Sequence, residues 1–570
     1  MSNLVAPYGG KLVNLVIDED KAEQLKRESE SFPAITLTQR QQCDLEMLLV
    51  GALSPLRGFM DEQTWQSVVD KARLPDGTLW PMPFCLDVSE SLADKLKPGD
   101  RLALRDVEGF MPAVLTVSSI WQPDKQHEAQ QVYGTTDDAH PGVKALYEST
   151  GKVYIGGEVV GVQLPFHYDF ETLRDTPAQL RAYFTRQGWS RVVGFHTSKP
   201  MHSVHREITL RAAREVNANI LIHPVVGMSK PGDIHYHARV HCYQAILQQY
   251  PKNLVALSLL PMAMRMAGPR EALMNAIIRQ NYGCSHYIVG TEHAAPPNVR
   301  DDAPRFYASG EAQQYVTDHQ QELAIEIVAA PELVYDRDAA RFVEREASDA
   351  RDTQVPWSNK KVLDAISHRS EIPQWISYPR VLDEIRRVCP PRNQKGLTLF
   401  FTGLSGSGKS TLAKIIHARF IEEGGRPVTL LDGDIVRHNL SSELGFSKKD
   451  RDINVKRIGF VASEITKNRG VAICAPIAPY ADTRQYVREL IEQYGAFIEI
   501  HVSTPLEVCE QRDRKGLYAK ARKGIIPEFT GISDPYEEPA EPEIRIDTAN
   551  TTPKEATQQI YLYLIREGYL

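Results

Sequence analysis

A nine-residue loop constrains this chain more than any other stretch of its sequence. Gly403–Thr411 reads GLSGSGKST and matches the phosphate-binding pattern GxxxxGK[ST]. It follows an apolar run, Leu397–Phe401, that predicts a buried strand, and it leads into Ser410–Glu423, whose apolar spacing predicts a helix. Glycines let backbone N–H groups surround phosphate oxygens at a helix N-terminus, where the helix dipole favours anions. The strand, loop and helix together predict a site for nucleotide phosphates.

The side chains of this loop have separate expected roles. Lys409 is expected to reach the β- and γ-phosphates and to be catalytic, and the Ser410 hydroxyl is expected to bind Mg²⁺ that accompanies ATP. The loop residues expected to bind ATP are Gly403, Ser405, Gly406, Ser407, Gly408, Lys409, Ser410 and Thr411. The loop alone does not identify the group that accepts the phosphate.

Further apolar runs alternate with helical stretches after the loop. Val428–Leu431, Val471–Cys474 and Ala496–Val502 each predict a strand, and the sequence between them is long enough for helices. Strands that alternate with helices predict a parallel, doubly wound sheet. Two adjacent prolines, Pro390 and Pro391, with polar residues after them predict a domain junction just before this region.

The first two thirds of the chain contain a second α/β pattern. Arg191–Phe195, Leu221–Val226 and His286–Val289 predict strands separated by helical stretches, whereas the residues before them are rich in turns and short apolar runs. At roughly 150 residues per domain, 570 residues imply about three to four domains. We expect an α/β multidomain protein with a β-rich segment 1–168, an α/β segment 169–330, a small appended region and linker 331–390, and the P-loop domain 391–570.

Composition excludes several classes of protein. The net charge of −7 argues against a dedicated nucleic-acid binder. No apolar run approaches the roughly 20 residues of a membrane helix, and the N-terminus shows no secretory signal. The seven cysteines are scattered and never spaced as CxxC, which is typical of a reducing compartment. We therefore expect a cytoplasmic protein without nucleic-acid or membrane partners.

Charged motifs follow the phosphate-binding loop. Leu431–Arg437 reads LDGDIVR, and a carboxylate at the carboxyl edge of a parallel sheet faces the ligand crevice and can accept a hydroxyl proton. The later motifs are FSKKDRDIN (446–454), APIAPY (475–480), RDRKGLY (512–518), and FTGI with DPYE (529–537).

As a set, these motifs resemble adenylyl-sulfate kinase (APS kinase) over about residues 395–570. The resemblance implies transfer of the ATP γ-phosphate to the 3′-hydroxyl of adenosine 5′-phosphosulfate (APS), which gives PAPS. It implies that Asp434 is the base or a metal-linked carboxylate and that Arg512 lies near the ATP base. Phe529 would stack on adenine from a mobile lid. The residues implied for the APS pocket are Asp434, Arg437, Phe446, Arg451, Asn454, Ile477, Lys515 and Phe529.

One position departs from the kinase pattern. Many members of the family carry Ser where this chain has Ala478, and that Ser has been considered as a phosphate acceptor. Because Ala478 has no hydroxyl, we expect direct in-line transfer to APS.

The first 370 or so residues resemble ATP sulfurylase (sulfate adenylyltransferase). The motifs that carry this resemblance are GALSPLRGFM (51–60), PMHSVHRE (200–207), IHPVVG (222–227) with KPGD (230–233), and MRMAGPRE (264–271). The resemblance implies a PUA-like N-terminal domain and a Rossmann-like nucleotidyltransferase domain, which makes APS and pyrophosphate from ATP and sulfate. The whole chain is thus similar to bacterial fusions of the two enzymes.

Two motifs of the sulfurylase site are altered. His202 and His205, which contact ATP phosphates in the family, are present. Before them the family reads Gln-x-Arg-Asn-Pro, with Gln and Arg holding sulfate, whereas this chain has His196, Ser198 and Lys199 at the three changed positions. Similarly, the family's Gly-Arg-Asp-His becomes Gly-Thr-Glu-His, with Thr291, Glu292 and His293. Losing guanidinium contacts with an oxyanion, each worth roughly 1.5–3 kcal/mol, predicts an impaired site.

Seven of the 17 histidines lie between His196 and His241. Such spacing can gather imidazoles around a metal ion, but no carboxylate or thiolate pattern accompanies them, so a nucleotide motif and ordinary packing are the preferred interpretation.

We predict an ATP-dependent APS kinase that carries a sulfurylase-like domain impaired in catalysis, as a scaffold or regulatory site. Two alternatives stay open. A bifunctional enzyme would use His196 and Lys199 as a variant sulfate site, and a non-catalytic sensor would bind nucleotides without turnover, although Lys409, Ser410 and Asp434 argue against that. The partners expected are ATP, APS and PAPS. Both families form homo-oligomers, so we expect one here.

Overall fold

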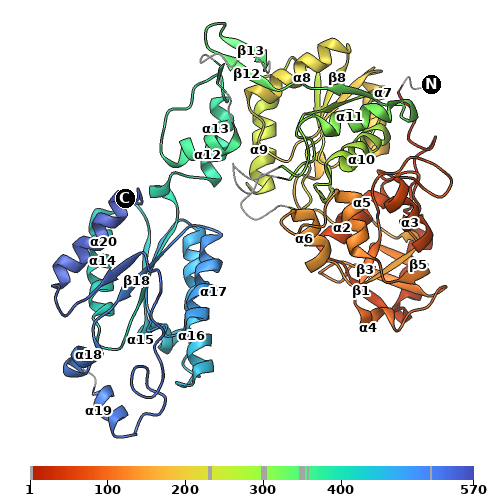
Figure 1. Ribbon diagram of the computed structural model, residues 1–570. Helices are drawn as coiled ribbons and strands as arrows, with labels where there is room; N and C mark the ends of the chain where they lie inside the picture. The colour runs from red at the N-terminus through yellow and green to blue at the C-terminus, as the bar shows by residue number, and fades with distance from the viewer. Residues whose placement is uncertain (1–3, 229–233, 297–304, 346–353, 356–357, 514–515) are drawn as a thin grey trace. The chain divides into compact units, whose positions relative to one another are not determined.

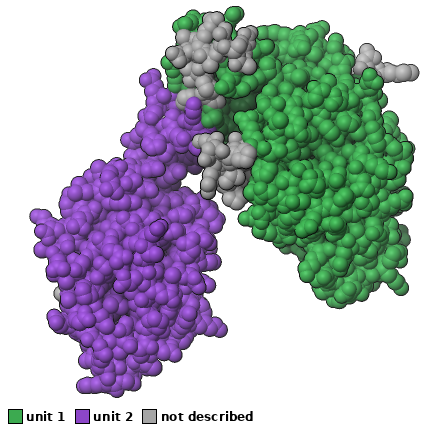
Figure 2. All heavy atoms as spheres, in the orientation of Figure 1, with its two compact units in different colours: residues 1–359, 373–384 green, residues 360–372, 385–570 purple. Residues whose placement is uncertain are grey.

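The computed structural model describes residues 4–228, 234–296, 305–345, 354–355, 358–513 and 516–570. Two compact units are present. One comprises residues 1–359 and 373–384, and the other comprises residues 360–372 and 385–570 (Figure 2).

The N-terminal part of the first unit is built around a six-stranded sheet. Its strand order is β1-β4-β5-β6-β2, and β3 pairs with β6. The long central pair β5 and β6 is antiparallel, and its apolar residues enter the largest core of the unit. The strands are β1 (Ala34–Thr36), β2 (Gly58–Phe59), β3 (Leu86–Val88), β4 (Arg101–Arg105), β5 (Ala113–Trp121) and β6 (Val153–Gly161). The flanking helices, which the sequence pattern did not predict, are α1 (Glu19–Glu28), α2 (Gln39–Leu49), α3 (Glu62–Lys71), α4 (Glu90–Ala93), α5 (Lys125–Tyr133) and α6 (Pro141–Glu148).

The middle of the first unit holds a five-stranded sheet in which every strand pair is parallel. The order is β11-β10-β7-β8-β9, and Figure 1 labels β8 together with the helices of this part, α7 to α11. The strands are β7 (Val192–Phe195), β8 (Asn219–Ile222), β9 (Val255–Leu257), β10 (His286–Val289) and β11 (Glu326–Ala329). The helices are α7 (Pro177–Arg186), α8 (Ser203–Glu215), α9 (Tyr236–Leu247), α10 (Gly268–Asn281) and α11 (Glu311–Asp318).

The second strand of this sheet differs from the sequence prediction. We expected a strand over Leu221–Val226, but β8 begins at Asn219 and ends at Ile222. Pro224 lacks an N–H group and cannot continue the ladder. Because β8 ends at Ile222, His223 lies in the loop that follows the strand.

The appended region after this sheet contains a small antiparallel sheet and two helices. Its sheet order is β13-β12-β14, and Trp375 stacks on Tyr335 of β12 with ring centroids 4.2 Å apart. The elements are β12 (Leu333–Asp336), β13 (Arg341–Glu344), β14 (Gln354–Val355), α12 (Asn359–Ser367) and α13 (Pro379–Val388).

The second unit is a parallel sheet with helices on both faces. The order is β16-β17-β15-β18-β19, and every pair is parallel. Alternate residues of β15 enter opposite cores: Leu399 packs with α14 and α20, whereas Phe400 packs with α16 and α17. The strands are β15 (Leu397–Thr402), β16 (Val428–Asp432), β17 (Val471–Ala475), β18 (Ala496–Val502) and β19 (Ile544–Ile546). The helices are α14 (Lys409–Glu423), α15 (Gly433–Leu440), α16 (Lys448–Lys467), α17 (Ala481–Glu492), α18 (Leu506–Arg512), α19 (Leu517–Arg522) and α20 (Pro553–Arg566).

Within the described residues, no helix is long and apolar enough to cross a membrane. All seven cysteines are free thiols.

Candidate functional site

The phosphate-binding loop connects the central strand β15 to the N-terminus of α14. Gly403, Gly406 and Gly408 adopt φ angles of 143°, 76° and 105°, which side-chain-bearing residues rarely adopt. At Gly403 a Cβ atom would also lie 2.5 Å from the carbonyl oxygen of Val502, so β18 allows no side chain there. The loop therefore has the backbone curvature that the sequence pattern required.

Lys409 lies inside this loop. Its Nζ donates hydrogen bonds to the carbonyl oxygens of Gly403 (2.9 Å) and Leu404 (2.7 Å), and the residue is 7% exposed. The ammonium is thus held where a phosphate group would sit, by backbone acceptors that a bound phosphate oxygen can replace.

Side chains that lie 113 and 141 positions later in the sequence support the loop. Thr548 Oγ1 donates to the carbonyl of Ser407 (2.8 Å), and Tyr518 donates to the carbonyl of Ser405 (2.8 Å). Arg512 donates to Thr548 Oγ1 (2.7 Å) and to its carbonyl (2.8 Å). Thr548 therefore links Arg512, the last residue of α18, to the phosphate-binding loop.

Residues expected at the acceptor pocket gather on α15, α16 and the loops around them. The guanidinium of Arg437 lies 4.2 Å from the ring centroid of Phe446. Asn454 on α16 is buried, and its Oδ1 has no hydrogen-bond partner among the described residues. The Ile477 carbonyl accepts hydrogen bonds from Thr402 Oγ1 (2.7 Å) and from the backbone N–H of Gly403 (3.3 Å), so the loop 475–480 touches the start of the phosphate-binding loop.

A partly buried ion pair joins α16 to the segment that carries Phe529. Arg451 pairs with Asp534, and its guanidinium also donates to Thr530 Oγ1 (2.7 Å). Tyr480 donates to the same Asp534 carboxylate (2.8 Å). Burial, together with this hydrogen bond to a carboxylate, raises the pKa of Tyr480 to about 12. The ring of Phe529 lies 5.0 Å from that of Tyr518.

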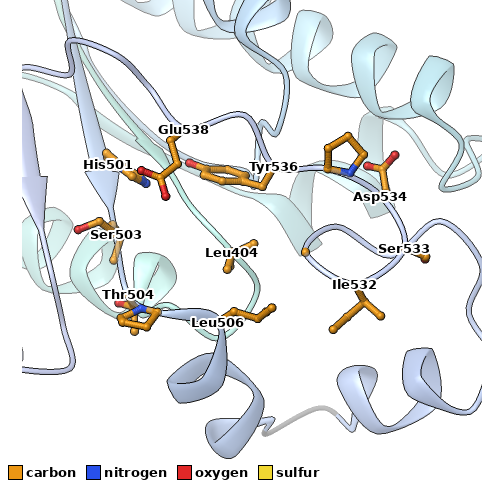
Figure 3. Close-up of a pocket in the computed structure, with 14 residues that line it drawn as sticks. Leu404, His501, Ser503, Thr504, Leu506, Ile532, Ser533, Asp534, Tyr536 and Glu538 are labelled. Carbon is orange, nitrogen blue, oxygen red and sulfur yellow. The ribbon is translucent and has the colours of Figure 1, made fainter.

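A pocket of about 590 Å³ opens beside the loop (Figure 3). Leu404 lies between the loop after β18, which carries Ser503 and Thr504, and the segment 531–538 (Figure 3). His501 at its edge is 2% exposed and stacks on Tyr536, and burial lowers its pKa to about 4.

Some predicted residues lie outside the described part of the structure. Lys515 lies in residues 514–515, which the structure does not describe. The KPGD motif (230–233) lies in residues 229–233, which are also outside the described part. Asp434 lies in α15, but its side chain is not described.

In the first unit, three histidines follow three neighbouring parallel strands. His293 follows β10, His196 follows β7 and His223 follows β8. The rings of His196 and His293 lie 5.3 Å apart, and His293 Nε2 is 2.9 Å from the hydroxyl of Tyr287. Burial lowers the pKa of all three, to about 3 for His293, so the imidazoles are neutral near pH 7.

The pair His202 and His205 stands at the N-terminus of α8. His202 Nε2 donates to Asn359 Oδ1 (2.7 Å), and its Nδ1 accepts from Ser377 (2.8 Å). His205 Nδ1 accepts from the backbone N–H of His202 (3.0 Å). Burial lowers the pKa of His202 to about 4 and that of His205 to about 3. His202 thus has both ring nitrogens engaged by the appended region, whereas His205 keeps its Nε2–H.

The altered positions lie in loops beyond β7 and β10. The Ser198 carbonyl accepts a hydrogen bond from buried Arg239 (2.7 Å), and the Lys199 side chain is exposed. Glu292 is exposed and pairs with Arg305. Among the described residues, neither loop carries a guanidinium of its own at positions 198 and 291. Sequence reasoning missed Arg239 and Arg279 because each lies in a helix outside the motifs that carry the resemblance.

Comparison with protein-family models divides the chain into three consecutive matches. A PUA-like domain matches residues 5–164, ATP-sulfurylase matches 171–388, and adenylylsulphate kinase matches 395–547. This chain is 46% identical to the sulfate adenylyltransferase of Phaeosphaeria nodorum and 46% identical to that of Coccidioides immitis. Each comparison covers 99% of this chain and 99% of the relative. The chain belongs to the sulfate adenylyltransferase family, in the form that carries an adenylylsulphate kinase domain.

A solved structure also matches over the full length. The hexameric APS kinase from Thiobacillus denitrificans has 42% sequence identity and a TM-score of 0.82, and all of both chains is covered. The predicted fold class is confirmed: a PUA-like N-terminal domain, parallel α/β sheets and a P-loop kinase. The predicted fusion of the two enzymes is confirmed as well. The curated relatives named above are fungal, so a bacterial origin stays a prediction.

Proposed function

We propose that this chain transfers the γ-phosphate of ATP to the 3′-hydroxyl of APS, and that its sulfurylase-like unit is impaired in catalysis. The kinase part rests mainly on Lys409 inside the phosphate-binding loop, together with Arg437 on α15 and with Arg451 and Asn454 on α16. Cations and an amide around a phosphate-binding loop suit an anionic nucleotide acceptor. The full-length structural match is itself titled an APS kinase.

The chain's own residues would supply positioning and charge. Lys409 would exchange its carbonyl partners for phosphate oxygens, and Arg512 would lie beside the ATP base. Asn454 Oδ1, which has no hydrogen-bond partner among the residues that the structure describes, would accept a hydrogen bond from APS. Asp434, at the start of α15, would take the proton of the attacking hydroxyl. Ala478 is buried and has no hydroxyl, which favours direct transfer.

Mg²⁺ is the metal that fits this site. The Ser410 hydroxyl stands in the first turn of α14, and hydroxyl and phosphate oxygens are the hard ligands that Mg²⁺ prefers. When bound with ATP, the ion would neutralise charge on the β- and γ-phosphates.

The proposed impairment of the sulfurylase-like unit rests on the two altered loops. Ser198 and Thr291 replace arginines of the family pattern, and Glu292, which replaces the aspartate of that pattern, pairs with Arg305. The second candidate is a bifunctional enzyme that also makes APS from ATP and sulfate. Its support is the intact His205, which offers Nε2–H at a helix N-terminus, and the name of the curated relatives.

Separate assays of the two half-reactions test both proposals. We expect PAPS from ATP plus APS, and no sulfate-dependent pyrophosphate from ATP plus sulfate. Pyrophosphate release at a rate matching the kinase would establish the bifunctional alternative and reject impairment. No PAPS from supplied APS would reject the kinase proposal.

A reversion series extends the second assay. The combined variant His196→Gln, Ser198→Arg, Lys199→Asn, Thr291→Arg and Glu292→Asp restores the family pattern in both loops. Recovery of sulfate-dependent pyrophosphate release would attribute the impairment to these loops.

We also propose that the chain works as a homo-oligomer, since the full-length structural match is titled hexameric. Sedimentation equilibrium of the purified chain tests this, and a monomer at micromolar concentration would reject it.

A further inference from the structure

Arg484 on α17 is a buried arginine of the kinase unit, and its side chain is only 5% exposed. Its guanidinium contacts three groups. Nη1 donates to the carbonyl of Ala478 (2.8 Å), Nη2 donates to the carbonyl of Glu537 (2.8 Å), and Nε lies 2.9 Å from a carboxylate oxygen of Glu499 on β18. Because a guanidinium is a planar fork with several donors, one side chain can hold all three groups at once. Arg484 therefore ties the loop 475–480 and the segment 529–538 to β18.

The backbone of the loop 475–480 is held at three successive carbonyl groups. The carbonyls of Ile477, Ala478 and Pro479 each accept a hydrogen bond from a residue outside the loop. Arg484 is the donor at the middle one. Ala478 also has a φ of 46°, in the left-handed region that residues with a side chain rarely adopt. Such a backbone persists only where its surroundings fix it, so these hydrogen bonds keep the loop in its shape.

The segment 529–538 meets this loop at Glu537. The backbone N–H of Glu537 donates to the carbonyl of Pro479 (2.8 Å), and its carboxylate accepts from the backbone N–H of Ala481 (2.7 Å), the first residue of α17. A carboxylate at a helix N-terminus is also favoured by the helix dipole. With the carbonyl bound by Arg484, the N–H, the carbonyl and the side chain of Glu537 are all engaged. The segment is therefore docked on the loop at one residue.

The two segments that Arg484 joins both carry residues proposed for the APS pocket. Ile477 lies in the loop, and Phe529 lies in the segment. The phosphate-binding loop is supported separately, by hydrogen bonds from Thr548 and Tyr518 to its carbonyls. The contacts of Arg484 therefore lie on the side of the acceptor and not on the side of ATP.

We propose that Arg484 is a positioning residue of the kinase site, which holds the loop 475–480 against the segment 529–538 in the arrangement that receives APS. It acts through the carbonyls of Ala478 and Glu537 and through its ion pair with Glu499. This inference rests on the proposed kinase function, since it assigns Arg484 to the binding of the acceptor in that reaction.

Steady-state PAPS formation by the full chain, with APS and ATP varied in turn, tests the role. In Arg484→Met the KM for APS should rise at least about tenfold, because two hydrogen bonds from a charged donor are lost, while the KM for ATP should stay within about twofold. A variant that is merely less folded loses active enzyme, which lowers the apparent kcat and leaves both KM values unchanged. Arg484→Lys keeps a charge beside Glu499 without the planar fork and should give an intermediate KM for APS.

Arg488, one turn further along α17, offers a matched control. It pairs with the same Glu499 (3.4 Å) and with Glu543 (2.7 Å), and its hydrogen bonds within the described residues go to carboxylates and to no backbone carbonyl. Arg488→Met therefore removes a cation from the same network without releasing either segment. Its KM for APS should stay within about twofold of the wild-type value.

Hydrogen exchange of the nucleotide-free chain tests the tie between the segments without any activity. The amides of Ala481 and Glu537 should exchange at least about tenfold faster in Arg484→Met than in the wild type, and at the wild-type rate in Arg488→Met. If Arg484→Met does not fold, Arg484→Lys carries both measurements, with smaller changes in the same direction.

Four results would overturn the positioning role. They are an unchanged KM for APS in every Arg484 variant that folds, an equal rise in the KM for ATP, an equal rise in the KM for APS in Arg488→Met, and unchanged exchange at Ala481 and Glu537. A wild type that forms no PAPS rejects the proposed kinase function instead. The exchange rates would then still decide whether Arg484 holds the two segments together.

Discussion

Arg451, which is expected to bind APS, is paired with Asp534 of the segment that carries Phe529. The two side chains are only 11% and 14% exposed, and Thr530 and Tyr480 share the pair. The Asp534 carboxylate thus occupies the guanidinium that we propose for APS binding. The pair also anchors the segment 529–538 on α16.

Asp534→Asn should loosen the segment 529–538. Hydrogen bonds to charged groups contribute about 1.5–3 kcal/mol each, so amide exchange in this segment should become at least about tenfold faster. Hydrogen-exchange mass spectrometry measures this. Glu538→Gln is the control, because the pair between Glu538 and Arg545 is exposed and such pairs contribute little. Equal protection in Asp534→Asn and wild type would show that the pair does not anchor the segment.

Lys409→Ala should abolish PAPS formation with supplied APS, lowering kcat by about a thousandfold or more, because a positioned cation on the transferred phosphate is lost. The fold should survive, since Nζ donates to the carbonyls of Gly403 and Leu404 in its own loop, and Thr548 and Tyr518 support that loop independently. Lys414→Ala, on the exposed face of the same helix, should keep wild-type rates. Steady-state assays with both variants make the comparison, and retained activity in Lys409→Ala would mean that the site is misplaced.

Gly403→Ala should disrupt nucleotide binding. Its φ of 143° strains any side-chain-bearing residue by about 1–3 kcal/mol, and the added Cβ would meet the Val502 carbonyl at 2.5 Å. Gly425→Ala is the matched control, with φ of 97° and open space around the Cβ position. Titration with ATP should show a much larger loss of affinity for Gly403→Ala. Similar affinities in the two variants would contradict the importance of the β18 contact.

Acid should destabilise the first unit through His202. Its pKa falls from 6.5 to about 4 on folding because burial disfavours the charged ring. The resulting stability is fully present above pH 6.5 and is lost as the pH falls toward 4, because the unfolded state then binds the proton first. The loss amounts to about 3 kcal/mol at most. Denaturant unfolding measures the free energy of unfolding at pH 7 and at pH 5. The decrease between the two pH values should be smaller in His202→Gln than in the wild type. His127→Gln, a substitution at the surface, is the control and should show the same decrease in unfolding free energy as the wild type.

The kinase loop could be predicted from sequence because its chemistry is local. The glycines of residues 403–408, Lys409 and Ser410 occupy one turn between a strand and a helix, and the strand Ala496–Val502 was predicted with its observed bounds. The spacing of neighbouring residues predicts this site because the conformation of a short backbone segment is what binds phosphate.

The contacts that position the other residues could not be predicted, because they join distant parts of the chain. Arg451 and Asp534 are 83 residues apart, and His202 reaches Asn359 and Ser377 across 157 and 175 residues. Arg279 gave no signal in the sequence, because it lies in α10 outside any recognised motif. The surroundings of Arg279 are set by neutral groups that packing brings together from other parts of the chain, such as His196.

The altered sulfurylase positions all stand in loops, while the strands below them keep their parallel order and buried cores. Since loops at the carboxyl edge carry the chemistry and the sheet carries the stability, substitutions at these positions can change a reaction without unfolding the protein. Variants at these positions should therefore keep the unfolding free energy of the unit even where the chemistry at the carboxyl edge changes.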